Sequence, residues 1–126
     1  MAKYVDGFVL LVPNNKTKEY KKMATEGRDI WMKLGALEYY ECKGDDLKVQ
    51  EMGGMKALAF PKLTKAKPSE NVWFSFIVYK SKKHRDQVNA KVMAEMNEKY
   101  KDNKDMSMPF DMNRMSYGGF NVEVEG

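Results

Sequence analysis

The chain has 126 residues, of which 43% are hydrophobic and 32% are charged. This length fits one domain with one core, and the balance of apolar and charged residues excludes an intrinsically disordered chain. The 22 Lys and Arg residues against 18 Asp and Glu give a net charge of +4, a mild excess that attracts anions without specifying any. Nucleic-acid binding is not expected, because nucleic-acid-binding proteins concentrate positive charge on one face or motif. We expect a single domain over residues 1–126.

Cys42 is the only cysteine, so no disulfide can form within the chain, and a reducing compartment is the natural environment. The apolar run 8–12 is too short for the core of a signal peptide. No apolar stretch approaches the length that crosses a bilayer. The sequence therefore predicts a cytoplasmic protein that does not associate with membranes.

The chain opens with a strand, a helix and a second strand. Residues 3–12 are rich in β-branched and aromatic types and end at Pro13, which predicts a strand. Apolar residues at three- and four-residue steps then predict a helix from about 16 to 34 that stops at Gly35. They are Tyr20, Met23, Ala24, Gly27, Ile30, Trp31 and Leu34. Residues 36–43 predict the second strand, which Gly44, Asp45 and Asp46 end.

The middle of the chain is a long polar stretch that is rich in glycine and proline. Within it, residues 56–60 form a candidate short extra strand. Residues 72–80, with the sequence VWFSFIVYK, are the strongest strand of the chain. Ser81 is then placed to cap a helix that runs to about Tyr100, with apolar residues at four-residue steps.

The C-terminal part is predicted to contain a polar loop and a last strand. The loop covers residues 101–111, and the strand covers residues 113–124. Gly118 and Gly119 suggest a bulge within this strand, because glycine weakens a regular ladder and often marks such a site.

The order of these elements is strand, helix, strand, strand, helix, strand. This is the split βαβ pattern of ferredoxin-like folds. The sequence thus predicts an α+β domain with an antiparallel sheet and both helices on one face of it. We expect the first and third strands to be central, parallel neighbours, because each crossover is right-handed. The two helices would then begin at the same edge of the sheet.

Both faces of the central strands are apolar. In the first strand Tyr4, Phe8 and Leu10 alternate with Val5, Val9 and Leu11, and in the third Phe74, Phe76 and Val78 alternate with Trp73, Ile77 and Tyr79. Two helices cover only one face of such a sheet, so the second face needs another cover. A second copy packed face to face under two-fold symmetry is the simplest cover. The sequence therefore predicts a homodimer.

Four segments carry a family resemblance: YVDGFVL at 4–10, GALEYYEC at 35–42, FSFIVYKSKKHRDQVNAKVM at 74–93 and MPFDMNRMSYGGF at 108–120. With them the chain resembles the YbaA-like bacterial proteins, a domain-of-unknown-function family. That family is similar to the dimeric α/β-barrel superfamily, in which two ferredoxin-like sheets pack into a barrel. The resemblance implies no catalytic residues to carry over, and members of the superfamily differ in chemistry, so the fold alone fixes no reaction.

Basic residues gather where the second helix is predicted to begin. Lys82, Lys83, His84 and Arg85 oppose the helix dipole there, which makes them candidates for binding an anion such as phosphate or carboxylate. Lys16 and Lys18 would lie at the same sheet edge and widen the patch. The alternative is a solvated helix end that keeps the protein soluble.

Two acidic residues occupy predicted strands. Asp6 shares a face with apolar neighbours and needs a partner if it is buried; Arg114 in the neighbouring last strand is the candidate, as an ion pair or as one wall of a polar pocket. Glu41 and Cys42 point to opposite faces, so only one of them can look into a cavity between sheets.

One His and one Cys do not supply a metal-ligand set without clustered carboxylates, so neither a metal nor a cofactor is expected.

The first functional hypothesis is a homodimeric small-ligand-binding protein. Its cavity would be mostly apolar, for a small apolar or anionic ligand. The candidate ligand-binding residues are Asp6, Glu41, Phe74, Phe76, Tyr79, Arg114 and Tyr117. One alternative is a cofactor-independent monooxygenase or isomerase that acts on a small aromatic or apolar substrate. Another is a structural or interaction dimer without a substrate, so the sequence leaves open whether the protein is an enzyme.

Overall fold

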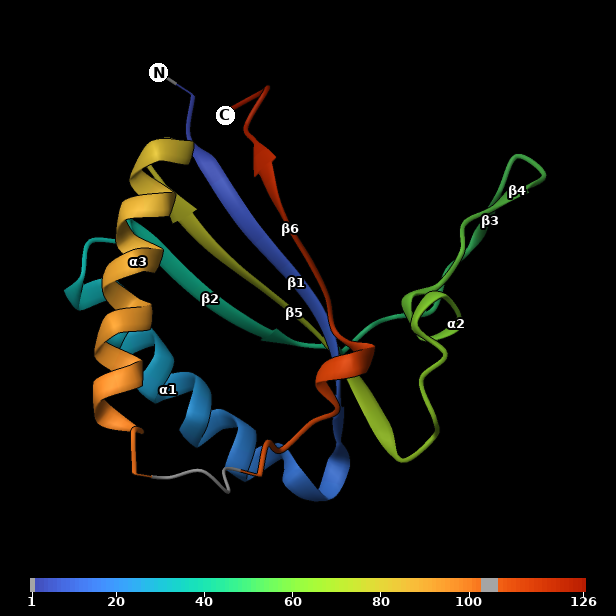
Figure 1. Cartoon of the computed structure of the whole chain (residues 1–126). Coiled ribbons are helices and arrows are strands. Elements are labelled where there is room, and N and C mark those ends of the chain that lie inside the picture. Colours follow the sequence, from blue (N-terminus) through green and yellow to red (C-terminus); the bar gives the residue numbers. More distant parts are fainter. Residues whose placement is uncertain (1, 103–106) are drawn as a thin grey trace.

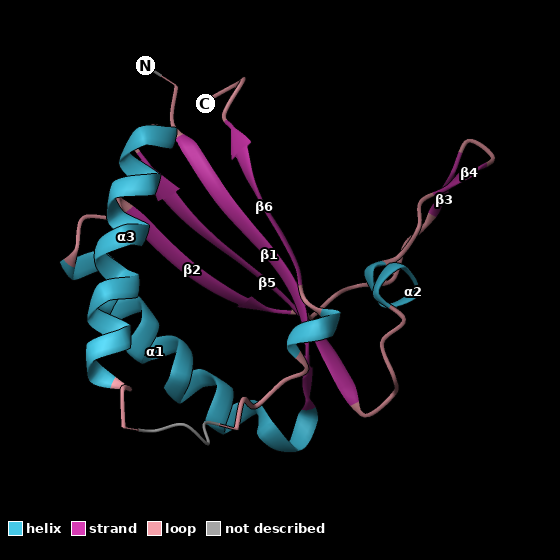
Figure 2. Cartoon of the chain, in the orientation of Figure 1, coloured by secondary structure: helices cyan, strands magenta, loops and turns pink. Residues whose placement is uncertain are grey.

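The computed structural model describes residues 2–102 and 107–126. Its body consists of β1 (Tyr4–Pro13), α1 (Thr17–Lys33), β2 (Glu38–Lys43), β5 (Glu70–Tyr79), α3 (Lys82–Lys99) and β6 (Ser116–Asn121). Shorter elements are the 3-10 turns η1 (Asn14–Lys16) and η2 (Met112–Arg114), the strands β3 (Glu51–Met52) and β4 (Met55–Lys56), and the helix α2 (Phe60–Thr64). Figure 1 shows their arrangement, and Figure 2 separates the helices from the strands.

One four-stranded sheet has the order β2-β5-β1-β6, and each neighbouring pair in it is antiparallel. The long helices α1 and α3 lie together on one side of this sheet (Figure 1). Two strands at the centre, one at each edge and two helices on one face make the ferredoxin-like arrangement. The predicted α+β ferredoxin-like fold is therefore confirmed.

The central strands β1 and β5 are antiparallel, so the prediction that they are parallel is wrong. Tyr4 lies opposite Tyr79, and Pro13 lies opposite Glu70. The right-handed crossover through α1 makes β1 and β2 parallel, while β5 is inserted between them. β5 starts at the end of the sheet where β2 stops. It therefore runs antiparallel to both β1 and β2.

As a consequence, the two long helices begin at opposite ends of the central strands, so the prediction that they begin at the same edge of the sheet is wrong. α1 follows the C-terminal end of β1, whereas α3 follows the C-terminal end of β5, beside the start of β1. Lys16 and Lys18 therefore lie at the far edge from residues 82–85. They cannot widen the predicted basic patch.

Several predicted boundaries also change. The capping prediction for Ser81 is confirmed, because its Oγ accepts a hydrogen bond from the His84 backbone N–H at 3.1 Å. The predicted strand over 56–60 is wrong: β4 stops at Lys56, and Pro61 stands in the first turn of α2, where its missing N–H costs no helical hydrogen bond. The last strand is shorter than predicted: η2 occupies Met112–Arg114, and β6 covers only Ser116–Asn121. The predicted loop 101–111 includes residues 103–106, which lie outside the described residues.

Gly118 and Gly119 do not form the predicted bulge, because β6 pairs with β1 in unbroken register. Gly7 lies opposite Gly118, and Asp6 lies opposite Gly119. A Cβ atom on Gly119 would lie 2.7 Å from the ring carbon Cε2 of Tyr4. This separation is well below the contact distance of two carbon atoms. Gly119 is therefore the residue that lets the Tyr4 ring approach the edge strand.

The core lies between the sheet and the two long helices, in two clusters of buried side chains. One contains Tyr4, Ile30, Ala36, Ile77, Tyr79, Val88 and Val92, and the other contains Leu10, Val12, Tyr20, Ala24 and Trp73. The sheet residues among them come from alternate positions of β1 and β5, as expected for one face of a pleated sheet. The two helices thus cover the core side chains on this face of the sheet.

The opposite face of the sheet, called the open face below, is not covered by α1 or α3. Leu11, Val72 and Val78 on this face are buried within the chain, whereas the part around Phe74 and Phe120 is exposed. The register places Phe74 beside Val9 and Phe76 beside Gly7 on this face. The Phe74 side chain is 45% exposed, and that of Phe120 on β6 is 60% exposed. The prediction that both faces of the central strands are apolar is confirmed.

Residues 45–69, called the arm below, leave the body between β2 and β5. The arm contains the β3–β4 hairpin and the short helix α2, and Figure 1 shows the hairpin standing away from the body. Its two strands pair only with each other in the described structure. The sequence predicted a polar stretch here with a short strand over 56–60, but not a projecting hairpin.

Substitution of Gly119 by Ala tests the close approach of Tyr4. We expect Gly119→Ala to lower the free energy of unfolding by about 2 kcal/mol, because the added methyl group overpacks a filled site. Gly118→Ala is the matched control, since its Cβ atom would lie 3.7 Å from the ring of Phe120, an ordinary contact. Urea unfolding measures both variants. Equal stability of the two variants would contradict the explanation.

Candidate functional site

The open face contains a groove with a volume of about 580 Å³. Its walls include Val5, Val9, Phe74, Phe76 and Phe120. The floor contains Gly7 and Gly118, which lie opposite each other on β1 and β6. Neither glycine carries a side chain, whereas the surrounding aromatic side chains project from the sheet. The groove is therefore deepest over the two glycines. This open-face groove is the candidate binding site.

The structure brings two of the predicted ligand-binding residues, Phe74 and Phe76, together in the wall of this groove. Tyr117 borders the groove, but it lies opposite Phe8 in the β1–β6 ladder and its ring stacks with that of Phe8 at 5.8 Å, on the face that packs against the helices.

Tyr79 does not line the groove, because it also lies on the face that packs against the helices and has no exposed surface. Its hydroxyl donates to Oδ1 of Asn89 at 3.1 Å, and the indole N–H of Trp31 donates to the same atom. Burial raises the pKa of Tyr79 above the ordinary value of a phenol. Tyr79 thus serves the contact between the sheet and α3.

A second cavity of about 420 Å³ lies between α1 and the edge strand β2, and is called the β2-edge cavity. Glu41 and Trp73 line it from the sheet, and Lys21, Arg28 and Lys43 also border it. One carboxylate and three cations leave an excess of positive charge, which suits a small anion better than a cation. Glu41 faces this cavity side, whereas Cys42 points to the open face and is exposed.

The carboxylate of Glu41 is held by three hydroxyl groups. Tyr20 donates to its Oε2 and Tyr39 to its Oε1, each at 2.8 Å, and the buried Ser75 hydroxyl also donates to Oε2. Burial, followed by the negative charge of Glu41, raises the pKa of both tyrosines far above its usual value. The tyrosines therefore stay protonated as donors. The cluster connects α1, β2 and β5, and its donors occupy the carboxylate oxygens that a general base would need free.

The sequence pattern does not predict the three hydroxyl groups around Glu41, because Tyr20 belongs to an apolar helix face and Tyr39 to an ordinary strand position. One signal does point to them: Ser75 and Glu41 are polar residues at positions that face the helices. Buried polar groups on neighbouring strands are normally hydrogen-bonded, so the two could have been paired.

Asp6 is buried and pairs with Arg85, not with Arg114 as predicted. Nη1 of Arg85 lies 2.6 Å from Oδ1 of Asp6, and its guanidinium stands over the Tyr4 ring at 4.9 Å. The prediction is wrong because Arg114 belongs to the η2 turn, away from the last strand, whereas the first turn of α3 stands above Asp6. The pair joins the start of α3 to the centre of the sheet.

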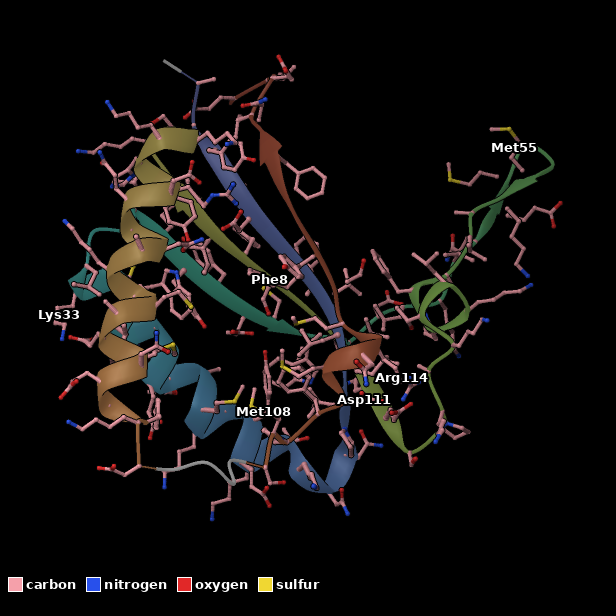
Figure 3. All side chains as sticks on the ribbon, in the orientation of Figure 1. Phe8, Lys33, Met55, Met108, Asp111 and Arg114 are labelled. Carbon is pink, nitrogen blue, oxygen red and sulfur yellow. The ribbon has the colours of Figure 1, made fainter. Side chains whose placement is uncertain are left out.

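Arg114 instead forms a two-point ion pair with Glu70 at the base of the arm. Its Nη1 lies 2.5 Å from Oε2 and its Nη2 lies 3.0 Å from Oε1, and Nη2 also donates to the Lys65 carbonyl at 3.1 Å. The hydrogen bonds from Arg114 lower the pKa of Glu70. In Figure 3 Arg114 stands where η2 meets the arm. Arg114 thus holds the arm and is separate from Asp6.

The basic residues at the start of α3 mostly contact groups of their own chain. His84 Nδ1 accepts the Lys80 backbone N–H at 2.9 Å, Lys82 Nζ lies 3.5 Å from Asp86, and Arg85 turns inward to Asp6. The predicted anion site at Lys82, Lys83, His84 and Arg85 stays a prediction. Ser81 already accepts the backbone N–H of His84 in the first turn of the helix, which leaves fewer free N–H groups for a ligand.

Across residues 2–102 and 107–126, no three His, Cys, Asp or Glu side chains gather as a set that could hold a metal ion. Within the same ranges, no helix combines the length and apolar character needed to cross a membrane.

Solved structures define the class of the protein by its fold. Two proteins from an uncultured marine organism, each described as a dimeric ferredoxin-like protein, match over the full chain. One has a TM-score of 0.61 at 13% identity and is covered over 98% of its length, and the other has a TM-score of 0.58 at 10% identity and is covered completely. At these identities the match concerns the fold alone, and it places the protein in the ferredoxin-like class.

The family follows from the sequence. Residues 3–112 match the family described as protein of unknown function (DUF1428), and the chain belongs to this family. The uncharacterized proteins YbaA of Escherichia coli (strain K12) and Shigella flexneri are each 41% identical over 123 residues, which cover 98% of this chain and 98% of theirs. The resemblance to YbaA-like proteins is confirmed.

The Asp6–Arg85 pair gives a prediction about stability. We expect Asp6→Asn to lower the free energy of unfolding by about 3 kcal/mol, because it leaves a largely buried guanidinium without its counter-charge. Asp86→Asn is the matched control: Asp86 also contacts Arg85, at 2.8 Å, but its side chain is 54% exposed, so little change is expected. Urea unfolding measures both. Similar losses in the two variants would show that burial does not decide the effect.

The Glu70–Arg114 pair gives a prediction about pH. Because the folded state holds the pKa of Glu70 below its unfolded value of about 4.3, the pair stabilises the fold above that pH. This stabilisation is lost as the pH falls through the lower folded pKa. Glu70→Gln should therefore melt at a lower temperature than the unmodified protein at pH 7, and the difference should shrink toward pH 2. Glu123→Gln, at an exposed position, is the control. A difference that does not change with pH would contradict the ion-pair role.

Proposed function

We propose that this protein is a homodimer that binds a small ligand, with two sheets packed open face to open face. The observation that carries the proposal is the open-face groove, whose aromatic walls are exposed to water in the single chain. Contiguous exposed apolar surface of this kind marks an interaction site more often than a tolerated patch. The description of the two solved neighbours as dimeric ferredoxin-like proteins supports the same arrangement.

The groove also suits a ligand by its size and chemistry. A volume of about 580 Å³ lies within the range of small-molecule pockets, roughly 300–1,000 Å³. The aromatic side chains of Phe74, Phe76 and Phe120 favour a flat apolar ligand. A second copy on the open face would close the groove from above and remove the ligand from water. We therefore propose a small apolar or aromatic compound as the ligand class.

Binding is favoured over catalysis in this groove. Among the described residues that line it, no side chain is a carboxylate, an amine or an imidazole. Asp6 and Glu41 both lie on the face covered by the helices, and each is held by donors of the chain. General acid–base catalysis by an oxygenase or isomerase would need an acid or a base near the substrate, and the polar residues at the groove, Ser116 and Tyr117, carry only hydroxyl groups. The single cysteine, which cannot form a disulfide within the chain, supports a cytoplasmic location as part of the proposal.

The oligomeric state and the binding of an aromatic probe test the proposal together. Sedimentation at micromolar concentration should show a dimer, and Phe74→Glu should give a monomer because it puts a charge in the apolar face. Met32→Glu, on the exposed surface of α1, should remain a dimer. The fluorescent probe 8-anilinonaphthalene-1-sulfonate should bind the unmodified protein saturably.

A groove variant separates ligand binding from assembly. Gly118→Val places two methyl groups in the groove, where a Cβ atom meets no atom closer than 3.7 Å, and should weaken probe binding about tenfold. Met32→Val should bind the probe as the unmodified protein does. A monomeric unmodified protein would refute the dimer. A dimer without saturable probe binding would refute the ligand site and support a dimer without a substrate.

A further inference from the structure

The arm exposes apolar side chains that its own chain does not cover. Met52 and Met55 lie side by side at the hairpin and are 75% and 77% exposed. Leu58, Phe60 and Leu63 are further large apolar side chains of the arm with exposed surface. A two-stranded hairpin is at best marginally stable by itself in water. Packing of its exposed apolar side chains on another surface would therefore stabilise the hairpin.

The base of the arm is held by hydrogen bonds and an ion pair, although the hairpin at its tip is exposed. The Gly44 backbone N–H donates to the Val72 carbonyl at 2.8 Å, which holds the chain where it leaves β2. On the return side, Arg114 contacts both the Lys65 carbonyl and the Glu70 carboxylate. Both ends of the arm are therefore held against the body before any partner binds. Preorganisation of this kind lowers the entropic cost of association.

The direction of the arm indicates its partner. In Figure 1 the arm projects from the end of the sheet where β5 begins, on the side away from α1 and α3. Figure 3 places Met55 at its far end, well clear of the body. The same side of the sheet carries the open face with Phe74 and Phe120. A molecule that covers the open face therefore lies beside the arm.

We propose that the arm packs its apolar side chains on a second copy of this chain. The inference rests on the proposed homodimer and adds a second contact region to it. In a two-fold dimer each chain gives one arm and receives one, so the arms extend the interface symmetrically beyond the two open faces. The contact covers the methionines of the hairpin and leaves the groove between the sheets unchanged.

Intermolecular paramagnetic broadening tests where the arm lies. In a Cys42→Ser background, Met55→Cys carries a nitroxide on unlabelled protein, which is then mixed with nitrogen-15-labelled Cys42→Ser protein to exchange subunits. We expect the label to broaden signals of the labelled chain. A nitroxide at Met32→Cys on α1, on the far side of the sheet, should not produce this broadening. No broadening by the Met55 label in an exchanged dimer would overturn the arm contact.

The dissociation constant of the dimer gives a second test. The triple variant Met52→Ser, Met55→Ser, Leu58→Ser removes apolar surface from the arm, and we expect the dissociation constant in sedimentation to rise at least tenfold. Val124→Ser, at an exposed apolar position outside the arm, should leave it unchanged. An unchanged constant in the triple variant, with native circular dichroism, would overturn the inference and leave the dimer intact. A monomeric unmodified protein would instead refute the proposed function.

Discussion

The structure depends on one constraint: two helices can cover only one face of a four-stranded sheet. β1 and β5 lie at the centre of this sheet and carry apolar side chains on both faces. Beneath the helices those side chains form the core, whereas on the open face Phe74 and Phe120 stay exposed. The hydrophobic effect therefore leaves the single chain incomplete, because a large apolar area remains in water. The groove, the proposed dimer and the placement of the arm all follow from this imbalance.

Polar groups beneath the helices have a different role from the groove. Asp6 and Glu41 are negative charges on the covered face, and each is bound by donors from a helix: Arg85 of α3 and Tyr20 of α1. An unpaired charge in such a place would be strongly unfavourable, so each acid restricts the position of the helix that supplies its donor. These two acids therefore specify how the helices sit on the sheet, while the apolar groove is left for binding.

The sequence predicted the order of the elements and the apolar character of both sheet faces, because periodicity records which side chains are buried. It did not give the relative direction of β1 and β5, since an alternating pattern reads the same in both directions. The partner of Asp6 was also missed. Arg85 is the partner of Asp6 because of the way α3 crosses the sheet, which the sequence pattern does not encode. The pattern also does not show that Arg114 lies in a turn. The arm was hidden because its apolar residues are scattered among charges, without a period.

The strand order also bears on how the chain acquires its structure during synthesis. β1 and β2 are both made early, but they are not neighbours, because β5 lies between them. The N-terminal half therefore contains no strand pair of the main sheet. β1 stays without a sheet partner until β5 has been made, so ordering of this domain waits for its C-terminal half. A ribosome-bound chain that ends before β5 would present the apolar β1 strand to other proteins, including chaperones.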